Sequence, residues 1–271
     1  MTDVVLGLGV GRWMALVAAL LTLLVMVESW IGHYRSGFPL RMQYAPLAAG
    51  SVLVVASVAA ALAPDVVLVQ LILRATGWLA VVAGVIGVGY HHRYGIAEKA
   101  GGYRWLLHYL MYGAPQLAPL ALSVAGAVGI VASHALAHHA TVAGIALPRA
   151  LLALVSIALA GAIVQSGILH YRGAFNTPLM YAPLVLPPLA MVGAAWLAAA
   201  PGARVVGVTR AVLWATFLLG FVGLGMHLRG LDRQMGGLHV FLFNLLQGPP
   251  PLAPAVFTTL AAAGLLALEG Y

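Results

Sequence analysis

The sequence contains no cysteine and very few charged residues. The absence of cysteine excludes disulfides, thiolate nucleophiles and iron-sulfur clusters held by cysteine. Charged residues make up only 7% of the 271 positions and hydrophobic residues 63%, whereas a soluble domain carries about a quarter charged residues. We therefore expect an integral membrane protein of the all-α class that crosses a bacterial cytoplasmic membrane several times.

Several common catalytic and nucleotide-binding motifs are also missing. The chain has no Walker loop, dinucleotide-binding glycine fingerprint, metalloprotease His-Glu-x-x-His motif or serine nucleophile elbow in a credible context. Its 13 Lys and Arg residues are scattered through short loops and form no basic stripe, which argues against a nucleic-acid partner. Membrane lipids are the expected counter-ions.

Long apolar runs separated by turn signals make up most of the chain. An α-helix needs about 20 apolar residues to cross about 30 Å of hydrocarbon. We predict eight transmembrane helices, at residues 13–34, 45–62, 66–91, 115–137, 150–170, 181–200, 205–228 and 252–268.

The sequence is internally duplicated. Residues 28–47 align with residues 165–184 at an offset of 137, with ten identities in 20 positions. Residues 74–93 align with 210–229 at an offset of 136. These matches predict two tandem four-helix halves, residues 1–145 and 146–271.

A weaker likeness divides each half into two helical hairpins. Each hairpin is a helix that ends in His-x-Arg, a polar loop and a proline-led helix. Because a hairpin crosses the membrane twice, the four repeats share one orientation, with pseudo-symmetry about an axis along the membrane normal. All four His-x-Arg motifs are then expected on one membrane face.

The His-x-Arg motif holds the candidate site residues. The histidines are His33, His91, His170 and His227, and the arginines are Arg35, Arg93, Arg172 and Arg229. Imidazoles that converge from different helices would ligate haem or a metal, and the nearby guanidinium groups would hold haem propionates or an anionic headgroup. A small residue precedes each histidine by one turn, which leaves space for a haem or for a close helix crossing. These residues are Ser29, Gly87, Ser166 and Gly223.

Four histidines allow two haems with two axial histidines each, or one four-histidine metal centre. The pairs can form within a half, as His33 with His91 and His170 with His227, or between halves, as His33 with His170 and His91 with His227. Haem b is the favoured cofactor, and copper, another metal ion or no cofactor are the alternatives. Without a cofactor, the histidines would be satisfied interfacial polar groups and the arginines lipid anchors.

Glu28 is an acidic residue well inside an apolar run, and its counterpart in the second half is Gln165. A carboxylate in this place is a candidate proton relay, and a hydrogen-bonded structural role is the alternative. On the opposite face, His134 and His138 have an i, i+4 spacing that suits metal chelation if the segment is helical, but an alanine- and histidine-rich loop at the interface is the favoured explanation.

The favoured function is that of a membrane-embedded redox subunit in an oxidoreductase complex, which binds haem b or a metal and passes electrons between quinone and a partner protein. The alternatives are a structural membrane anchor or lipid-binding subunit of a larger complex, and a proton-coupled transporter that uses Glu28. Expected partners are lipids, other subunits and quinone. Eight helices in two tandem halves are similar in architecture to haem A synthase, but that family's motifs are not recognisable, so no residue roles carry over.

Overall fold

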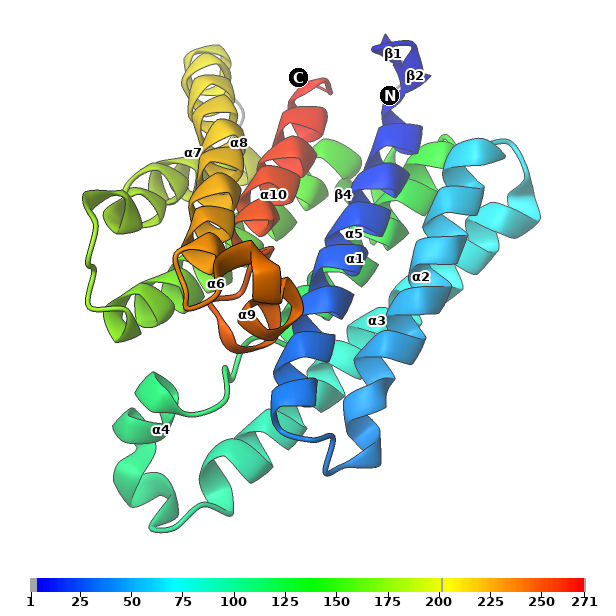
Figure 1. The fold of residues 1–271 in the computed structure, drawn as a ribbon. Helices are drawn as coiled ribbons and strands as arrows, with labels where there is room; N and C mark the ends of the chain where they lie inside the picture. The colour runs from blue at the N-terminus through cyan, green and yellow to red at the C-terminus, as the bar shows by residue number, and fades with distance from the viewer. Residues whose placement is uncertain (1–3, 201, 271) are drawn as a thin grey trace.

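The computed structural model describes residues 4–200 and 202–270, which form a bundle of α-helices (Figure 1). Within these residues, six helical segments are long and apolar enough to cross a membrane. They contain α1 (Val10–Arg35), α2 (Ala45–Leu62), α3 (Val67–His92), α6 (Leu147–Arg172), α7 (Leu186–Ala199) and α8 (Ala203–Asp232). Three further apolar helical segments of the described chain are shorter: α5 (Leu120–Leu136), Gly237–Gln247 and α10 (Ala253–Leu268). The chain is therefore an all-α protein with the helices of a multi-pass membrane protein.

Four helices form the centre of the bundle. α1 packs against α5, α6 packs against α10, and the α1–α10 and α5–α6 contacts join these two pairs. α2 and α3 cover one side, while α7 and α8 cover the other. Both ends of the described chain lie at the same end of the molecule (Figure 1).

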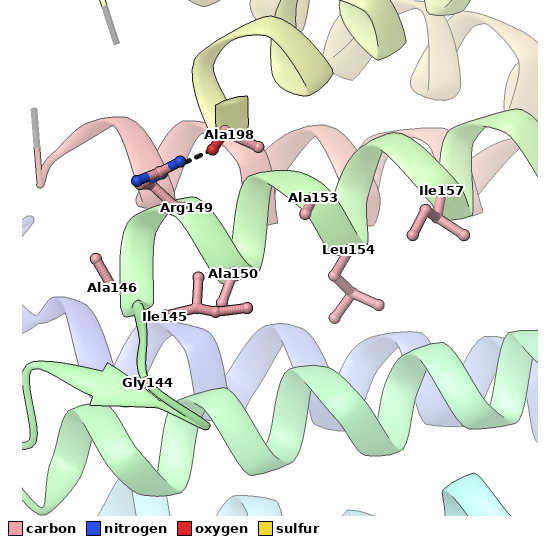
Figure 2. Close-up of a pocket in the computed structure, with 9 residues that line it drawn as sticks. All are labelled: Gly144, Ile145, Ala146, Arg149, Ala150, Ala153, Leu154, Ile157 and Ala198. Carbon is pink, nitrogen blue, oxygen red and sulfur yellow. Dashed lines mark hydrogen bonds between the residues drawn. The ribbon is translucent and has the colours of Figure 1, made fainter. Parts of the chain in front are cut away.

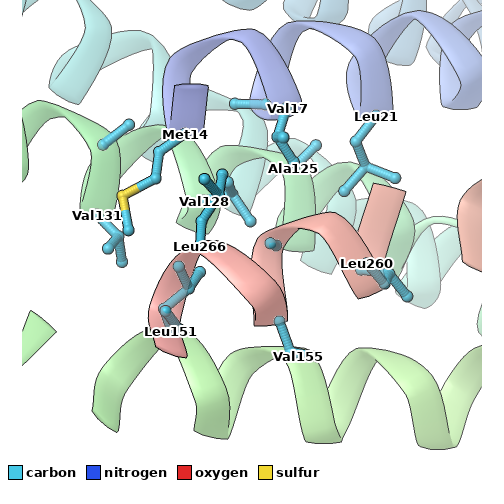
Figure 3. Packing of buried hydrophobic residues seen from close by; sticks show 14 of the residues in the cluster. Met14, Val17, Leu21, Ala125, Val128, Val131, Leu151, Val155, Leu260 and Leu266 are labelled. Atoms are coloured by element: carbon cyan, nitrogen blue, oxygen red, sulfur yellow. The ribbon is translucent and has the colours of Figure 1, made fainter. Parts of the chain in front are cut away.

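Aliphatic side chains of the four central helices fill the interior (Figure 3). Met14, Leu21, Val128 and Leu151 are buried where α1, α5, α6 and α10 meet. The outer helices instead expose large apolar side chains, such as Trp78. Exposed apolar surface of this kind suits contact with lipid, which is as apolar as the side chains themselves.

Glycine brings α3 close to α5. A Cβ atom on Gly77 would lie 2.8 Å from the carbonyl oxygen of Gly126. A Cβ atom on Gly84 would lie 2.6 Å from the carbonyl oxygen of Pro119. Small residues at such crossings let helix backbones approach in a membrane, where packing replaces the hydrophobic effect as the driving force.

Two short β-hairpins, which the sequence analysis did not predict, precede α1 and α6. Their turn residues, Leu6-Gly7 and Ala143-Gly144, all have positive φ, as a two-residue type I′ turn requires. The antiparallel strand pairs are β1 (Val4–Val5) with β2 (Leu8–Gly9), and β3 (Thr141–Val142) with β4 (Ile145–Ala146).

Two of the predicted helices begin later than expected. α5 begins at Leu120 instead of residue 115, and α7 begins at Leu186 instead of residue 181. Residues 178–184 form a 3-10 helix that contains Pro183. Because proline has no N–H group and fixes its φ, it starts a helix readily but does not continue one.

Two paired-histidine sites as the candidate functional site

The four motif histidines form two pairs, one in each half. The ring centroids of His33 and His91 lie 6.3 Å apart with the planes inclined by 68°. The rings of His170 and His227 also lie 6.3 Å apart, inclined by 59°. Of the two pairings that the sequence left open, the structure contains the one within each half.

A single four-histidine metal centre is not formed. Nowhere in residues 4–200 and 202–270 do three or more His, Cys, Asp or Glu side chains gather closely enough to hold a metal ion. Any metal at the motif histidines would therefore have no more than two ligands from His, Cys, Asp or Glu side chains of the described chain.

Backbone carbonyl groups orient three of the four rings. Each of these rings places Nδ1 at hydrogen-bonding distance from a carbonyl oxygen, at 2.8 Å for His91 to Pro115, 2.7 Å for His227 to Pro250 and 2.7 Å for His170 to Met180. Because a carbonyl oxygen only accepts, Nδ1 carries the proton in a neutral ring and Nε2 keeps its lone pair. A neutral imidazole whose Nε2 is unprotonated can bind iron, copper or zinc through that nitrogen.

His33 differs slightly from the other three. Its Nδ1 is buried and has no hydrogen bond of normal geometry within the described chain. The two pairs therefore have the same ring separation, but only in the second pair does a backbone carbonyl group bind both rings.

A stacked phenylalanine and tyrosine border each pair. Phe38 and Tyr44 stack with ring centroids 4.6 Å apart, and Phe38 lies 5.9 Å from the His33 ring. Their counterparts Phe175 and Tyr181 stack at 4.4 Å, and Phe175 lies 6.2 Å from the His170 ring. Each pair thus has a flat aromatic neighbour.

The two phenylalanines have an unusual backbone conformation. The φ angle is 49° at Phe38 and 45° at Phe175, which is rare for a bulky residue and costs about 1–3 kcal/mol. Strain of this kind persists where surrounding structure imposes it, often at functional sites. Four aromatic residues were not among the predicted site residues, although they are identical pairs in the 20-residue alignment at an offset of 137; these are Phe38, Tyr44, Phe175 and Tyr181.

The glycines that precede His91 and His227 by one turn serve a helix contact. A Cβ atom on Gly87 would lie 2.8 Å from Cβ of Pro119, and one on Gly223 would lie 2.7 Å from Cβ of Pro254. The space beneath these two histidines is filled by the first turn of α5 or α10. For Gly87 and Gly223, the close helix crossing is therefore the explanation that the structure supports.

Arg35 binds the second half of the chain. It donates from Nε to the carbonyl oxygen of Leu246 and, at 2.6 Å, from Nη2 to that of Gly248. These carbonyl groups lie at the end of the short helix α9 (Phe241–Gln247), which packs against α1 and α8. The guanidinium therefore satisfies carbonyl groups that a helix end leaves without partners.

Arg172 makes the reciprocal contact with the first half. It donates from Nε to the carbonyl oxygen of Met111 and, at 3.0 Å, from Nη2 to that of Gly113. These groups lie at the end of α4 (Leu106–Tyr112), which packs against α6. Arg35 and Arg172 thus hold the two halves together at the end that carries the histidine pairs.

The other two motif arginines have different surroundings. Arg93 forms an exposed ion pair with Glu98, with 2.6 Å between Nε and Oε1. Arg229 is exposed and has no hydrogen bond or ion pair within the part of the chain that the structure describes. Arg229 is therefore the motif arginine whose donors are all available to an external anion such as a propionate or lipid headgroup.

Glu28 connects α1 to α10. Its Oε1 accepts a hydrogen bond of 2.7 Å from the backbone N–H of Leu252, the residue before α10. A carboxylate is favourable there because the first N–H groups of a helix have no intrahelical partner and carry partial positive charge. Gln165 makes no corresponding bond to α5 among the described residues. This geometry is the structural role considered above, and proton transfer by Glu28 stays a prediction.

The expected i, i+4 pair on the opposite face is not formed. His138 has a φ of 56° and ends the helical path of α5. His139 turns back instead, so that its Nδ1 lies 3.2 Å from Nδ1 of His134. The His134–His138 chelate, which was the less favoured explanation, is therefore not formed, because α5 ends at Leu136, between the two residues.

The arrangement offers two separate pairs of imidazole rings at one end of the bundle. Such sites suit one-electron chemistry on a bound iron or copper centre, or simple polar packing if nothing binds. Comparison of the chain with known protein families, with curated proteins and with solved structures finds no match.

Proposed function

We propose that the chain is the membrane-embedded redox subunit of an oxidoreductase complex and binds one haem b at each histidine pair. The observation that carries this proposal is the 6.3 Å separation of the rings in both pairs. Two imidazoles that shared one metal ion, with metal–nitrogen distances of about 2.0–2.1 Å, would have ring centres about 6 to 6.5 Å apart. His33 with His91, and His170 with His227, could therefore each hold one haem iron.

The donor set fits haem iron. Nδ1 of His91, His170 and His227 is held by a backbone carbonyl group, so each ring presents Nε2 with a fixed orientation. The stacked rings of Phe38 and Tyr44, and those of their counterparts, add an apolar wall beside each pair. A haem bound in such a site supplies reversible one-electron transfer.

The membrane arrangement that we propose has eight transmembrane helices in two halves. α5 and α10, with 17 and 16 residues, reach about 25 Å at a rise of 1.5 Å per residue, near the lower limit for a span. Equivalent bonds support the two-half arrangement: Nε of Arg12 donates to the carbonyl oxygen of Ala61, and Nε of Arg149 donates to that of Ala198, both at 2.7 Å.

Electrons would enter and leave at the membrane face that carries the histidines. The short helices and turns there expose aromatic side chains, including Trp105, Tyr112, Phe241 and Phe243. Aromatic side chains with apolar bodies suit the membrane interface and the docking of a quinone ring or a partner subunit. These surfaces support quinone and a redox protein as the proposed partners.

The test is an optical spectrum with haem quantification on detergent-purified protein expressed with haem precursors supplied. We expect two haems b per chain and a Soret band. His170→Ala should remove about half of the haem, whereas His134→Ala, outside both pairs, should leave the content unchanged. A colourless preparation would overturn the haem assignment, and metal analysis of the same sample would identify copper or another ion if one of these is bound instead.

A structural membrane subunit is the second candidate. It is favoured by the bonds of Arg35, Arg172 and Glu28, which use these charges to join helices of the two halves. A stoichiometric partner protein that co-purifies with a chain free of haem and metal would select this role. A proton-coupled transporter is less well supported because Glu28 is held at the start of α10.

A further inference from the structure

A groove runs along the first turns of α6, at the end of the helix that lies far from His170 (Figure 2). Its volume is about 520 Å³, and one wall is the hairpin that precedes α6. Ala150, Ala153 and Ile157 line it along the helix, and Ala198 closes it from α7. Ile157 is 70% exposed, so the groove opens to the surroundings of the bundle.

The groove is charged at one end and apolar along the rest. Arg149 donates from Nε to Ala198 at 2.7 Å and from Nη2 to Ala199 at 3.1 Å, which fixes the guanidinium at the mouth of the groove. Its Nη1 makes no hydrogen bond with the described residues and is available to an anion. Ile157 lies two turns further, about 12 Å along the helix axis. A positive group at one end of an apolar wall suits an anionic phospholipid, whose charged headgroup is joined to apolar chains.

The equivalent place in the first half has the same arginine. At the offset of 137, Arg149 aligns with Arg12, which donates to the carbonyl oxygen of Ala61 at 2.7 Å. Both arginines therefore hold the end of the following helix, and that role alone does not require a groove.

The first half differs in the residues that follow the arginine. Ala150 aligns with Trp13, and Ala153 aligns with Leu16. The indole nitrogen of Trp13 donates to the carbonyl oxygen of Val5 at 2.6 Å, so the ring lies against the first hairpin, and Trp13 and Leu16 pack on the core. Large side chains thus cover in one half the surface that two alanines leave open in the other.

From this contrast we propose that the groove beside Arg149 binds one anionic phospholipid. The phosphate accepts hydrogen bonds from Nη1 of Arg149, and one acyl chain lies along Ala150, Ala153 and Ile157. The site is at the opposite end of α6 from His170. It does not depend on haem binding, so either proposal can fail without the other.

The test is native mass spectrometry of the detergent-purified chain titrated with dioleoyl phosphatidylglycerol. The double variant Ala150→Trp, Ala153→Leu installs the residues of the first half and should weaken binding of the first lipid about tenfold or more through lost apolar contact. Arg149→Gln should reduce the preference for phosphatidylglycerol over phosphatidylcholine by about fivefold, the effect of one cation near a lipid surface. Arg12→Gln is the matched control and should change neither quantity.

Two results would overturn the proposal. One is a double variant that elutes like the wild type in gel filtration and binds phosphatidylglycerol equally well. The other is equal binding of phosphatidylcholine and phosphatidylglycerol by the wild type. If the double variant does not fold, Ala153→Leu alone should weaken phosphatidylglycerol binding by a smaller amount. Unchanged binding in this single variant would contradict the proposed site. Glycerol phosphate should not compete, because the acyl chain supplies the apolar contact.

Discussion

His91 and Arg172 bind carbonyl groups two residues apart in the same short connector. Nδ1 of His91 lies 2.8 Å from the Pro115 carbonyl oxygen, and Nη2 of Arg172 donates to the Gly113 carbonyl oxygen at 3.0 Å. His91 belongs to the first half and Arg172 to the second, where it follows His170 by two residues. A shift of this connector would therefore affect a histidine of each pair.

The second connector repeats the relationship with the halves exchanged. Gly248 accepts from Arg35 at 2.6 Å, and the Pro250 carbonyl oxygen lies 2.7 Å from Nδ1 of His227. Arg35 follows His33 by two residues. The two histidine pairs are thus joined by two short segments, and a change at either arginine is expected to affect both sites.

Arg172→Ala should lower the free energy of unfolding by about 1 to 2 kcal/mol, because it removes hydrogen bonds from a charged donor to the end of α4. Thermal unfolding of the haem-free protein in detergent measures this loss. Arg229→Ala is the control, since Arg229 is exposed and has no partner in the described chain. An equal effect of the two substitutions would contradict the role assigned to Arg172.

The pairing within halves predicts a distinct pattern in double variants. His33→Ala combined with His91→Ala removes two ligands of one site, so about half of the haem should remain. His33→Ala combined with His170→Ala removes one ligand from each site, and the haem content should fall close to zero. Pyridine haemochrome quantification distinguishes the two results. Equal loss in both double variants would refute two independent sites.

Glu28→Ala should destabilise the protein by about 0.5–2 kcal/mol, the usual effect of losing a capping side chain at a helix start. Glu28→Gln keeps an oxygen that accepts from Leu252 and should cost less. Gln165→Ala is the matched change in the second half, where no such bond is present among the described residues, and should have little effect. Denaturation followed by circular dichroism compares the three variants. A larger loss in Gln165→Ala than in Glu28→Ala would exclude the capping role.

Gly84→Ala should destabilise the α3–α5 crossing by about 1–3 kcal/mol, as overpacking does. The added Cβ atom would lie 2.6 Å from the Pro119 carbonyl oxygen and 2.9 Å from the Ser123 backbone nitrogen, which cannot move freely. Gly89→Ala on the same helix meets no described atom within 4 Å. Alanine is the better helix former, so this control should be neutral or slightly stabilising. Melting temperatures of the two variants provide the comparison.

Much of the helical layout was predictable because it depends on neighbours in the sequence. Apolar length located the helices, and the repeated His-x-Arg motif located His33, His91, His170 and His227 at helix ends. The two hairpins were not predicted because their turns place Leu6 and Ala143 at a positive φ, where Asn or Asp is the usual signal.

The partners of the motif arginines could not be predicted, because identical motifs meet different distant segments. Arg35 bonds to Leu246, 211 residues away, whereas Arg93 bonds to Glu98, five residues away. The partners of Arg35 and Arg172 depend on how α9 and α4 pack against the other half of the chain. No local pattern carries that information.

The short helices α4 and α9 each pack against a helix of the other half, α6 and α1 respectively. These contacts have a consequence for the assembly of the chain. Arg35 leaves the ribosome long before Leu246 is synthesised, so the contact between α1 and α9 can form only after most of the chain has been made. Reciprocal contacts of this kind are those of an isologous dimer in which each copy completes the other. A fragment with only one set of four helices would therefore be expected to self-associate, with a second copy supplying the missing short helix.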